Sequence, residues 1–125
     1  MKDSIKFAVN ERIRLKQTSL EELAIDIEKA VAIVEGCYAA GGKILVCGNG
    51  GSAADAQHFS AEMMGKFKLA RRPLPCIALT TNSSIVTAWS NDFGFDSVFE
   101  RQVEALGSEN DLLVGITTSG NSKNV

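Results

Sequence analysis

A histidine and a glutamate stand four residues apart, at His58 and Glu62, in a segment whose apolar spacing predicts a helix. Residues at this spacing share one face of a helix, so an imidazole nitrogen and a carboxylate could act on the same ligand. One interpretation of the pair is half of a metal site. Another is a general base, because the apolar neighbours Met63 and Met64 can raise the pKa of the Glu62 carboxyl. His58 is the only histidine of the chain, and a purely structural role for it stays open.

The residues before this pair form a glycine-rich loop with the sequence CGNGGS. Gly48, Gly50 and Gly51 let the backbone turn sharply and approach a ligand without a Cβ in the way. We expect Ser52 to cap the following helix, whose free N–H groups would favour an anion such as a phosphate. The loop is not the dinucleotide fingerprint, because Ala53 stands where glycine is needed, and it is not a Walker loop. A plain strand-to-helix turn is the alternative.

A second polar loop, TTSGNS, spans residues 117–122. Its hydroxyls, from Thr117, Thr118, Ser119 and Ser122, and its free amides suit a phosphate monoester, although a hydroxyl-rich turn without a ligand has the same composition. A third polar stretch lies before Phe93 and contains Asn91 and Asp92. These two residues could bind sugar hydroxyls or simply cap a helix.

Three short apolar runs, at residues 44–47, 76–79 and 112–116, alternate with segments of helical spacing. This order predicts an α/β fold with a doubly wound parallel sheet, in which ligands bind at the carboxyl ends of the strands. Each run is followed by a polar loop, so three loops should converge on one crevice. Because no crossover helix follows the last loop, we expect the chain to be the first portion of a longer domain.

The first 40 residues predict two helices that meet at Thr18 and Ser19, where Ser19 and Glu22 would form a capping box. The second helix is apolar over more of its circumference than one buried face needs. It is therefore either an oligomer interface or a central core helix of a monomer. We expect residues 1–40 to be oligomer-forming N-terminal helices and residues 41–125 to be the first part of the sheet domain.

The composition excludes several classes of protein. Thirteen basic and 15 acidic residues give a net charge of −2, which argues against nucleic-acid and membrane-surface partners. Three cysteines without metal-ligand spacing, Cys37, Cys47 and Cys76, fall in apolar segments and predict reduced core thiols in a cytoplasmic protein. The N-terminus lacks the features of a signal peptide, and no apolar run approaches the ~18 residues of a membrane span.

Four separated stretches now allow a resemblance to be stated: GGKILVCGNGGSAADAQHFSAE, SNDFGF, RQVEALG and GITTSGNS. In this order they resemble the phosphoheptose isomerases of the sugar-isomerase (SIS) family, from about Gly41 onward, and the N-terminal helices also fit. The resemblance implies a Rossmann-like SIS fold with a five-stranded parallel sheet, three strands of which lie in this chain. It also implies a homotetramer with active sites between subunits. The implied activity is an aldose–ketose isomerisation of sedoheptulose 7-phosphate to D-glycero-D-manno-heptose 7-phosphate, for bacterial surface glycans such as lipopolysaccharide.

The same resemblance implies roles for particular residues. Glu62 matches the catalytic acid/base, and His58 and Glu62 match the ligands of a zinc ion, one per subunit. The phosphosugar substrate would be bound by Asn49, Gly50, Gly51, Ser52, Glu62, Asn91, Asp92, Thr117, Thr118, Ser119 and Ser122. Serine is common in the family where Thr117 stands, and this change keeps a hydroxyl. The remaining glutamine and histidine of the family lie beyond residue 125, so half of the catalytic set is expected here.

The main alternative is a non-catalytic SIS protein, such as the factor that associates with the bacterial replication initiator or a regulator that senses sugar phosphates. The initiator-associating relative shares much of the glycine loop and the following helix but lacks an acid where Glu62 stands. Glu62 and the NDFGF segment therefore favour the enzyme.

Overall fold

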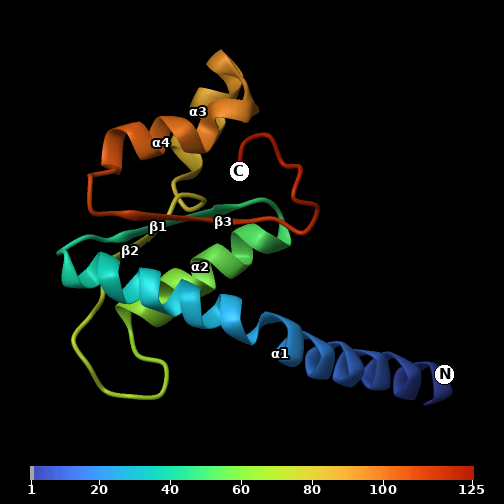
Figure 1. Cartoon of the computed structure of the whole chain (residues 1–125). Coiled ribbons are helices and arrows are strands. Elements are labelled where there is room, and N and C mark those ends of the chain that lie inside the picture. Colours follow the sequence, from blue (N-terminus) through green and yellow to red (C-terminus); the bar gives the residue numbers. More distant parts are fainter. Residues whose placement is uncertain (1) are drawn as a thin grey trace. The chain divides into compact units, whose positions relative to one another are not determined.

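The computed structural model describes residues 2–125. The chain forms, in order, α1 (Lys2–Ala39), β1 (Ile44–Gly48), α2 (Gly51–Met64), β2 (Cys76–Ala78), α3 (Ser83–Phe93), a 3₁₀ helix (Phe95–Ser97), α4 (Val98–Leu106) and β3 (Leu112–Ile116) (Figure 1). Two compact units result, one ending at Glu35 and the other spanning Gly36–Val125. The three predicted strands are all present, and they lie in the second unit.

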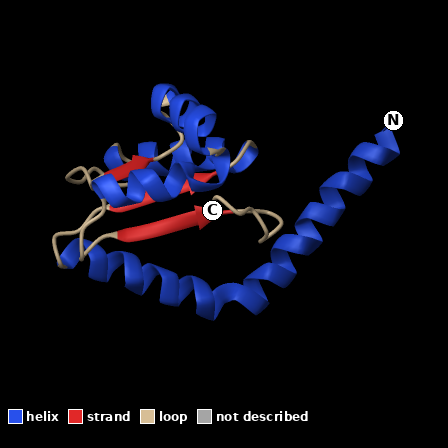
Figure 2. Cartoon of the chain, turned by 90° about the horizontal axis from the view of Figure 1, so that it is seen from above, coloured by secondary structure: helices blue, strands red, loops and turns tan. Residues whose placement is uncertain are grey.

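The sheet has the strand order β2-β1-β3, and both pairings are parallel. Ile44 of β1 is in register with Cys76 of β2 and with Leu112 of β3. All five residues of β1 are buried, because this strand lies between two others and is covered on both faces. Figure 2 shows the three strands side by side.

Helices cover both faces of this sheet: α2 lies on one side, and α3 and α4 lie on the other (Figure 1). The core on the α4 side contains Leu45, Cys47 and Leu79 against Val98 and Phe99. On the α2 side, Ser60 Oγ donates a 2.7 Å hydrogen bond to the Cys76 carbonyl. The predicted doubly wound α/β architecture is confirmed.

The predicted break between two N-terminal helices is wrong. The helix α1 runs without interruption through Thr18 and Ser19, and Thr18 Oγ1 donates to the Arg14 carbonyl at 3.2 Å. A hydroxyl satisfied by the preceding turn can remain inside a helix, so the residues that favour a cap do not end it here. Large apolar side chains are exposed along the helix rather than packed in a core; they are Ile5, Phe7, Val9, Ile13, Leu15, Leu20, Leu23, Ile25, Ile27, Val31 and Ile33.

Two further boundaries differ from expectation. The N-cap of α2 is Gly50, with φ 56° and ψ −118° and no side-chain cap, so Ser52 is not the cap but a buried residue of the first turn. The helix α3 extends to Phe93, so Asn91 and Asp92 lie within a helix rather than in a polar break. Within the described residues, no helix has the length and apolar character that a membrane crossing requires.

The three cysteines are unpaired and buried, as predicted for core thiols. Burial raises the pKa of the Cys47 and Cys76 thiols above the usual value, which keeps both sulfurs protonated at neutral pH.

A carboxylate fixes the amino ends of β1 and β3. Asp111 accepts hydrogen bonds from the Lys43 ammonium, from the Lys43 backbone N–H at 2.9 Å and from the Ser108 N–H at 2.7 Å. These bonds, the one from the ammonium first, hold the pKa of Asp111 below its ordinary value. Asp111 thereby sets the starts of the two strands whose opposite ends carry polar loops.

Candidate functional site

The glycine loop between β1 and α2 is shaped by two different constraints. A Cβ on Gly48 would lie 2.8 Å from the Ser52 carbonyl oxygen and 2.9 Å from that of Ile116, so the tight fit of strand, helix and neighbouring strand requires glycine. Gly50 has a positive φ of 56°, which side chains rarely allow. Gly51 has neither constraint, because a Cβ there would meet nothing within 4 Å. The open space above Gly51 is available to a ligand.

His58 and Glu62 lie one turn apart on α2, with 3.8 Å between His58 Nε2 and Glu62 Oε1. His58 is well exposed, whereas Glu62 Oε2 is buried and has no hydrogen-bond partner. The pair faces a hollow of about 470 Å³. The other lining residues are Asp55, Phe59, Met63, Phe67, Arg71 and Ile116.

The donor atoms of this pair fit part of a metal site. An unpartnered buried carboxylate oxygen loses its hydration and is stabilised by an added cation or proton donor. A zinc ion, however, takes at least three protein ligands even in catalytic sites. The described residues contain no group of three or more histidine, cysteine, aspartate or glutamate side chains arranged to hold a metal. His58 and Glu62 therefore supply two ligands of a set that other residues would complete.

Arg71 holds the end of α2, a role that the sequence did not single out. Its guanidinium donates to the carbonyls of Glu62 at 2.9 Å, Met63 at 2.8 Å and Arg72 at 3.0 Å. A basic side chain near a helix C-terminus commonly satisfies the last carbonyls, so the RR pair after α2 was the available signal. Because these bonds go to backbone oxygens, the Glu62 carboxylate remains free for a ligand.

The hydroxyl loop after β3 is ordered by its own side chains. Thr117 Oγ1 accepts a hydrogen bond from the Gly120 N–H at 3.2 Å and lies 3.3 Å from Ser122 Oγ. Ser119 Oγ accepts from the Asn121 N–H at 3.2 Å. Three of the four predicted hydroxyls are thus gathered in one exposed loop, whereas Thr118 takes part in none of the hydrogen bonds of the described residues.

An asparagine pair connects the two polar loops. Asn49 of the glycine loop exchanges two side-chain hydrogen bonds with Asn124, which follows the hydroxyl loop. Asn49 also lines a small hollow of about 140 Å³ with Gly48, Gly50 and Thr80, on the side of α3 and the 3₁₀ helix. The convergence of the loops after β1 and β3, predicted from the strand order, is confirmed.

Two predicted site residues are not joined to these loops. Asn91 and Asp92 are exposed on α3, and Asn91 Nδ2 donates to Asp92 Oδ1 at 2.8 Å. Among the described residues, no hydrogen bond or ion pair links either of them to the glycine or hydroxyl loop. Ser52 lies beneath the glycine loop and makes no capping bond.

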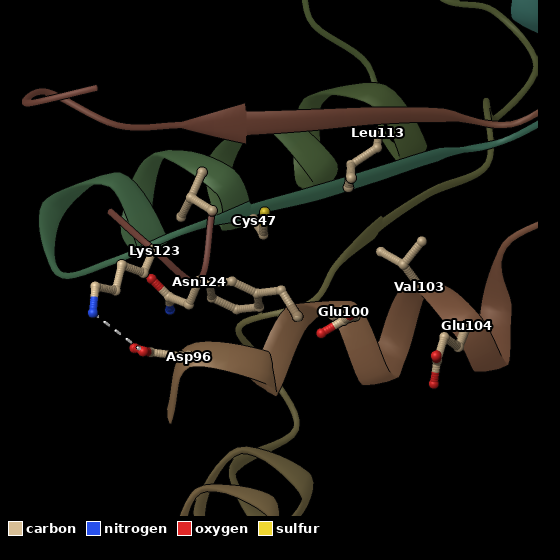
Figure 3. A pocket seen from close by; sticks show the side chains of 10 residues that line it. Cys47, Asp96, Glu100, Val103, Glu104, Leu113, Lys123 and Asn124 are labelled. Carbon is tan, nitrogen blue, oxygen red and sulfur yellow. Dashed lines mark ion pairs between the residues drawn. The ribbon is translucent and has the colours of Figure 1, made fainter. Parts of the chain in front are cut away.

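A third hollow, of about 520 Å³, lies between α4 and β3, on the face away from α2 (Figure 3). Its mouth carries Lys123 and Asp96, whose charged atoms are 3.9 Å apart (Figure 3). It is larger than the hollow at His58, yet it contains neither member of the histidine–glutamate pair. The hollow beside His58 and Glu62 is therefore the better candidate for the reactive site.

Comparison with known proteins gives consistent matches. The family model described as SIS domain matches residues 9–125. The phosphoheptose isomerase of Geobacter sp. (strain M21) is 55% identical over 125 residues, which is 100% of this chain and 65% of that protein. The phosphoheptose isomerase of Citrifermentans bemidjiense is 64% identical over 104 residues, which is 83% of this chain and 54% of that protein.

A solved structure supports the same relationship. The structure of phosphoheptose isomerase from Neisseria gonorrhoeae superposes with a TM-score of 0.91 at 49% identity, covering 98% of this chain and 64% of that one. This chain thus spans less than two thirds of the length of these relatives.

Proposed function

The chain belongs to the SIS domain family, and from that premise we propose that the protein is a phosphosugar isomerase. The proposed reaction converts sedoheptulose 7-phosphate to D-glycero-D-manno-heptose 7-phosphate. The observation that carries the proposal is the Glu62 carboxylate, which has one buried, unpartnered oxygen and faces a hollow beside His58. The names of the relatives agree with this choice of substrate.

Glu62 is the base of the proposed reaction. Aldose–ketose isomerisation moves a proton from C1 of the ketose to C2, through an enediol, while a hydroxyl proton passes from O1 to O2. A carboxylate that takes the C1 proton can return it to C2 on the same face of the sugar. The free oxygens of Glu62 suit this role because Arg71 binds the backbone of α2 rather than the carboxylate.

The polar loops bind the two ends of the substrate. The hydroxyls of Thr117, Thr118, Ser119 and Ser122 would hold the phosphate, with Ser52 nearby. Asn49, Gly50 and Gly51 would contact the sugar, where the space above Gly51 lets the substrate approach the backbone. Asn91 and Asp92, which are exposed on α3, would bind sugar hydroxyls.

A zinc ion is part of the proposal. His58 and Glu62 would provide two of its ligands, and the ion would polarise the substrate carbonyl. The buried Glu62 oxygen without a partner supports a bound cation at this position.

Self-association through α1 is the remaining part. The helix exposes side chains such as Leu23 (47%), Ile27 (55%) and Val31 (51%) to solvent, and exposed apolar surface of this extent is typical of an interface. We infer a homotetramer that works in the cytoplasm, where the unpaired cysteines remain reduced, and whose product enters heptose-containing surface glycans.

The decisive experiment incubates the purified full-length protein with sedoheptulose 7-phosphate and follows the aldose by NMR. We expect turnover, and a loss of about a hundredfold or more in Glu62→Gln, since general acid–base groups contribute roughly 10²–10⁴. The exposed Glu109 provides a control, because Glu109→Gln removes the same charge far along the chain from the pair. Zinc content measured on the same samples should fall in both Glu62→Gln and His58→Ala.

Two outcomes would count against this function. An inactive full-length wild-type protein would favour the non-catalytic alternative, and full turnover by Glu62→Gln would remove Glu62 from the chemistry. Unchanged zinc content in both variants would reject the pair as metal ligands without affecting the assignment of the base.

A further inference from the structure

Asn49 and Asn124 form a closed pair of side-chain amides. Asn49 Nδ2 donates to Asn124 Oδ1 at 2.8 Å, and Asn124 Nδ2 donates to Asn49 Oδ1 at 2.9 Å. Both side chains are partly buried. Each amide therefore uses its oxygen and one N–H on the other, so the relative orientation of the two side chains is fixed.

Asn124 is itself held on the sheet. The next residue, Val125, donates its N–H to the Ser122 carbonyl at 3.1 Å and packs against the core cluster on the α4 side. Its fit on β3 is close, because a Cβ on Gly115 would lie 2.8 Å from Val125 Cγ1. The backbone next to Asn124 is therefore held in place while its side chain contacts the glycine loop.

The pair also lies where two binding loops meet. Asn49 is preceded by Gly48, whose position is fixed by backbone packing, and is followed by Gly50, whose φ is positive. Asn124 comes two residues after Ser122, a member of the hydroxyl loop. Breaking the pair would let the two loops move relative to each other while leaving the hydrogen bonds within the hydroxyl loop intact.

We propose that Asn124 is a positioning residue that fixes Asn49, and thereby the distance between the loop that contacts the sugar and the loop that holds the phosphate. This inference rests on the proposed isomerase function. A substrate bound at two ends reacts efficiently only when both binding loops are correctly placed relative to each other. A small displacement of either loop lowers the rate. The amide of Asn49 has one N–H left for the substrate, with the other groups committed to Asn124.

The test is a double-mutant cycle of Asn49→Ala and Asn124→Ala, with kcat and KM for sedoheptulose 7-phosphate as the measured quantities. Asn124→Ala should lower kcat/KM about tenfold, which corresponds to about 1.4 kcal/mol. In the Asn49→Ala background the same change should have almost no further effect. Asn124→Asp keeps the shape but places an oxygen against Asn49 Oδ1, so it should lose at least as much as the alanine variant.

A control separates positioning from general stability. Asn110 Nδ2 donates to the Ala40 carbonyl at 3.2 Å. This bond also joins two segments that are distant in the sequence, but its residues precede β1 and β3, whereas Asn49 and Asn124 follow them. Asn110→Ala should lower the melting temperature by about as much as Asn124→Ala does. It should leave kcat/KM near the wild-type value. A further loss of about tenfold when Asn124→Ala is added to Asn49→Ala, or wild-type kcat/KM in Asn124→Asp, would overturn the proposal.

A second measurement is independent of the proposed function. In ¹⁵N-labelled protein, the Asn49 side-chain amide protons should exchange slowly with water and should exchange faster after Asn124→Ala. If the wild type lacks isomerase activity, the proposed function fails, while this readout still judges the pair. Asn49 exchange that is unaffected by Asn124→Ala would reject the pairing itself.

Discussion

Replacing the glycines of the β1–α2 loop by alanine, one at a time, tests how this loop is built. In Gly48→Ala the added Cβ would lie 2.8 Å and 2.9 Å from the Ser52 and Ile116 carbonyl oxygens. Overpacking in a core costs about 1–3 kcal/mol, and the upper end applies here because both obstacles are backbone atoms that cannot rotate away. At about 4 °C per kcal/mol for a chain of this size, the melting temperature should fall by about 12 °C.

The other two glycines should respond differently. Gly50→Ala keeps free space around the Cβ but places it at φ 56°, so a backbone strain of about 1–3 kcal/mol is expected. Gly51→Ala meets neither obstacle and should leave stability unchanged or raise it by up to about 1 kcal/mol, since alanine restricts the unfolded chain.

Thermal unfolding followed by circular dichroism measures all three variants. Gly51→Ala is the matched control, because it adds the same methyl group to the same loop. The proposed isomerase activity should nevertheless fall in Gly51→Ala, because the substrate is proposed to occupy the space next to Gly51. The reasoning is refuted if Gly48→Ala and Gly51→Ala melt within about 2 °C of each other.

Two further predictions concern the sheet and the assembly. The Asp111 pKa is lowered from 3.8, so its contribution to stability is fully present above that pH and is lost as the pH falls through the lowered value. Asp111→Asn should therefore flatten the acid limb of a melting-temperature profile as the pH falls below about 4, and an unchanged acid limb would exclude this role. For the assembly, Ile27→Asp should convert the proposed tetramer to smaller species, as measured by light scattering. The control variant Glu28→Asp, at the exposed neighbouring residue, should leave the tetramer intact. A tetramer that persists in Ile27→Asp, or a monomeric wild type, would contradict the interface on α1.

Local patterns predicted the elements of the sheet unit well. The apolar runs that became β1, β2 and β3 were recognisable because each is short and apolar throughout, and for β1 the reason is burial at all five positions. The helix boundaries were less predictable, since Thr18 and Ser19 have the chemistry of a break yet lie inside α1.

The cap of α2 shows the same limit. Ser52 is a better capping residue than glycine by propensity. The helix nevertheless starts after Gly50, two residues earlier, because glycine can adopt the positive φ of this turn. Propensity ranks residue types, whereas the turn is placed by the packing of β1 against its neighbours.

The sequence by itself determined the α/β class, the polar loops at the carboxyl ends of the strands and the spacing of His58 and Glu62 along one helix face. These features depend on the period of a strand or helix, which neighbouring residues set. Tertiary structure alone decided that Asn49 meets Asn124, 75 residues away, and that Gly48 must be glycine because Ile116 lies against it. It also gave Arg71 its place on the Glu62 carbonyl and left one Glu62 oxygen without a partner. The contacts of Asn49 and of Gly48 follow from the register of β1 against β3, which no local pattern contains.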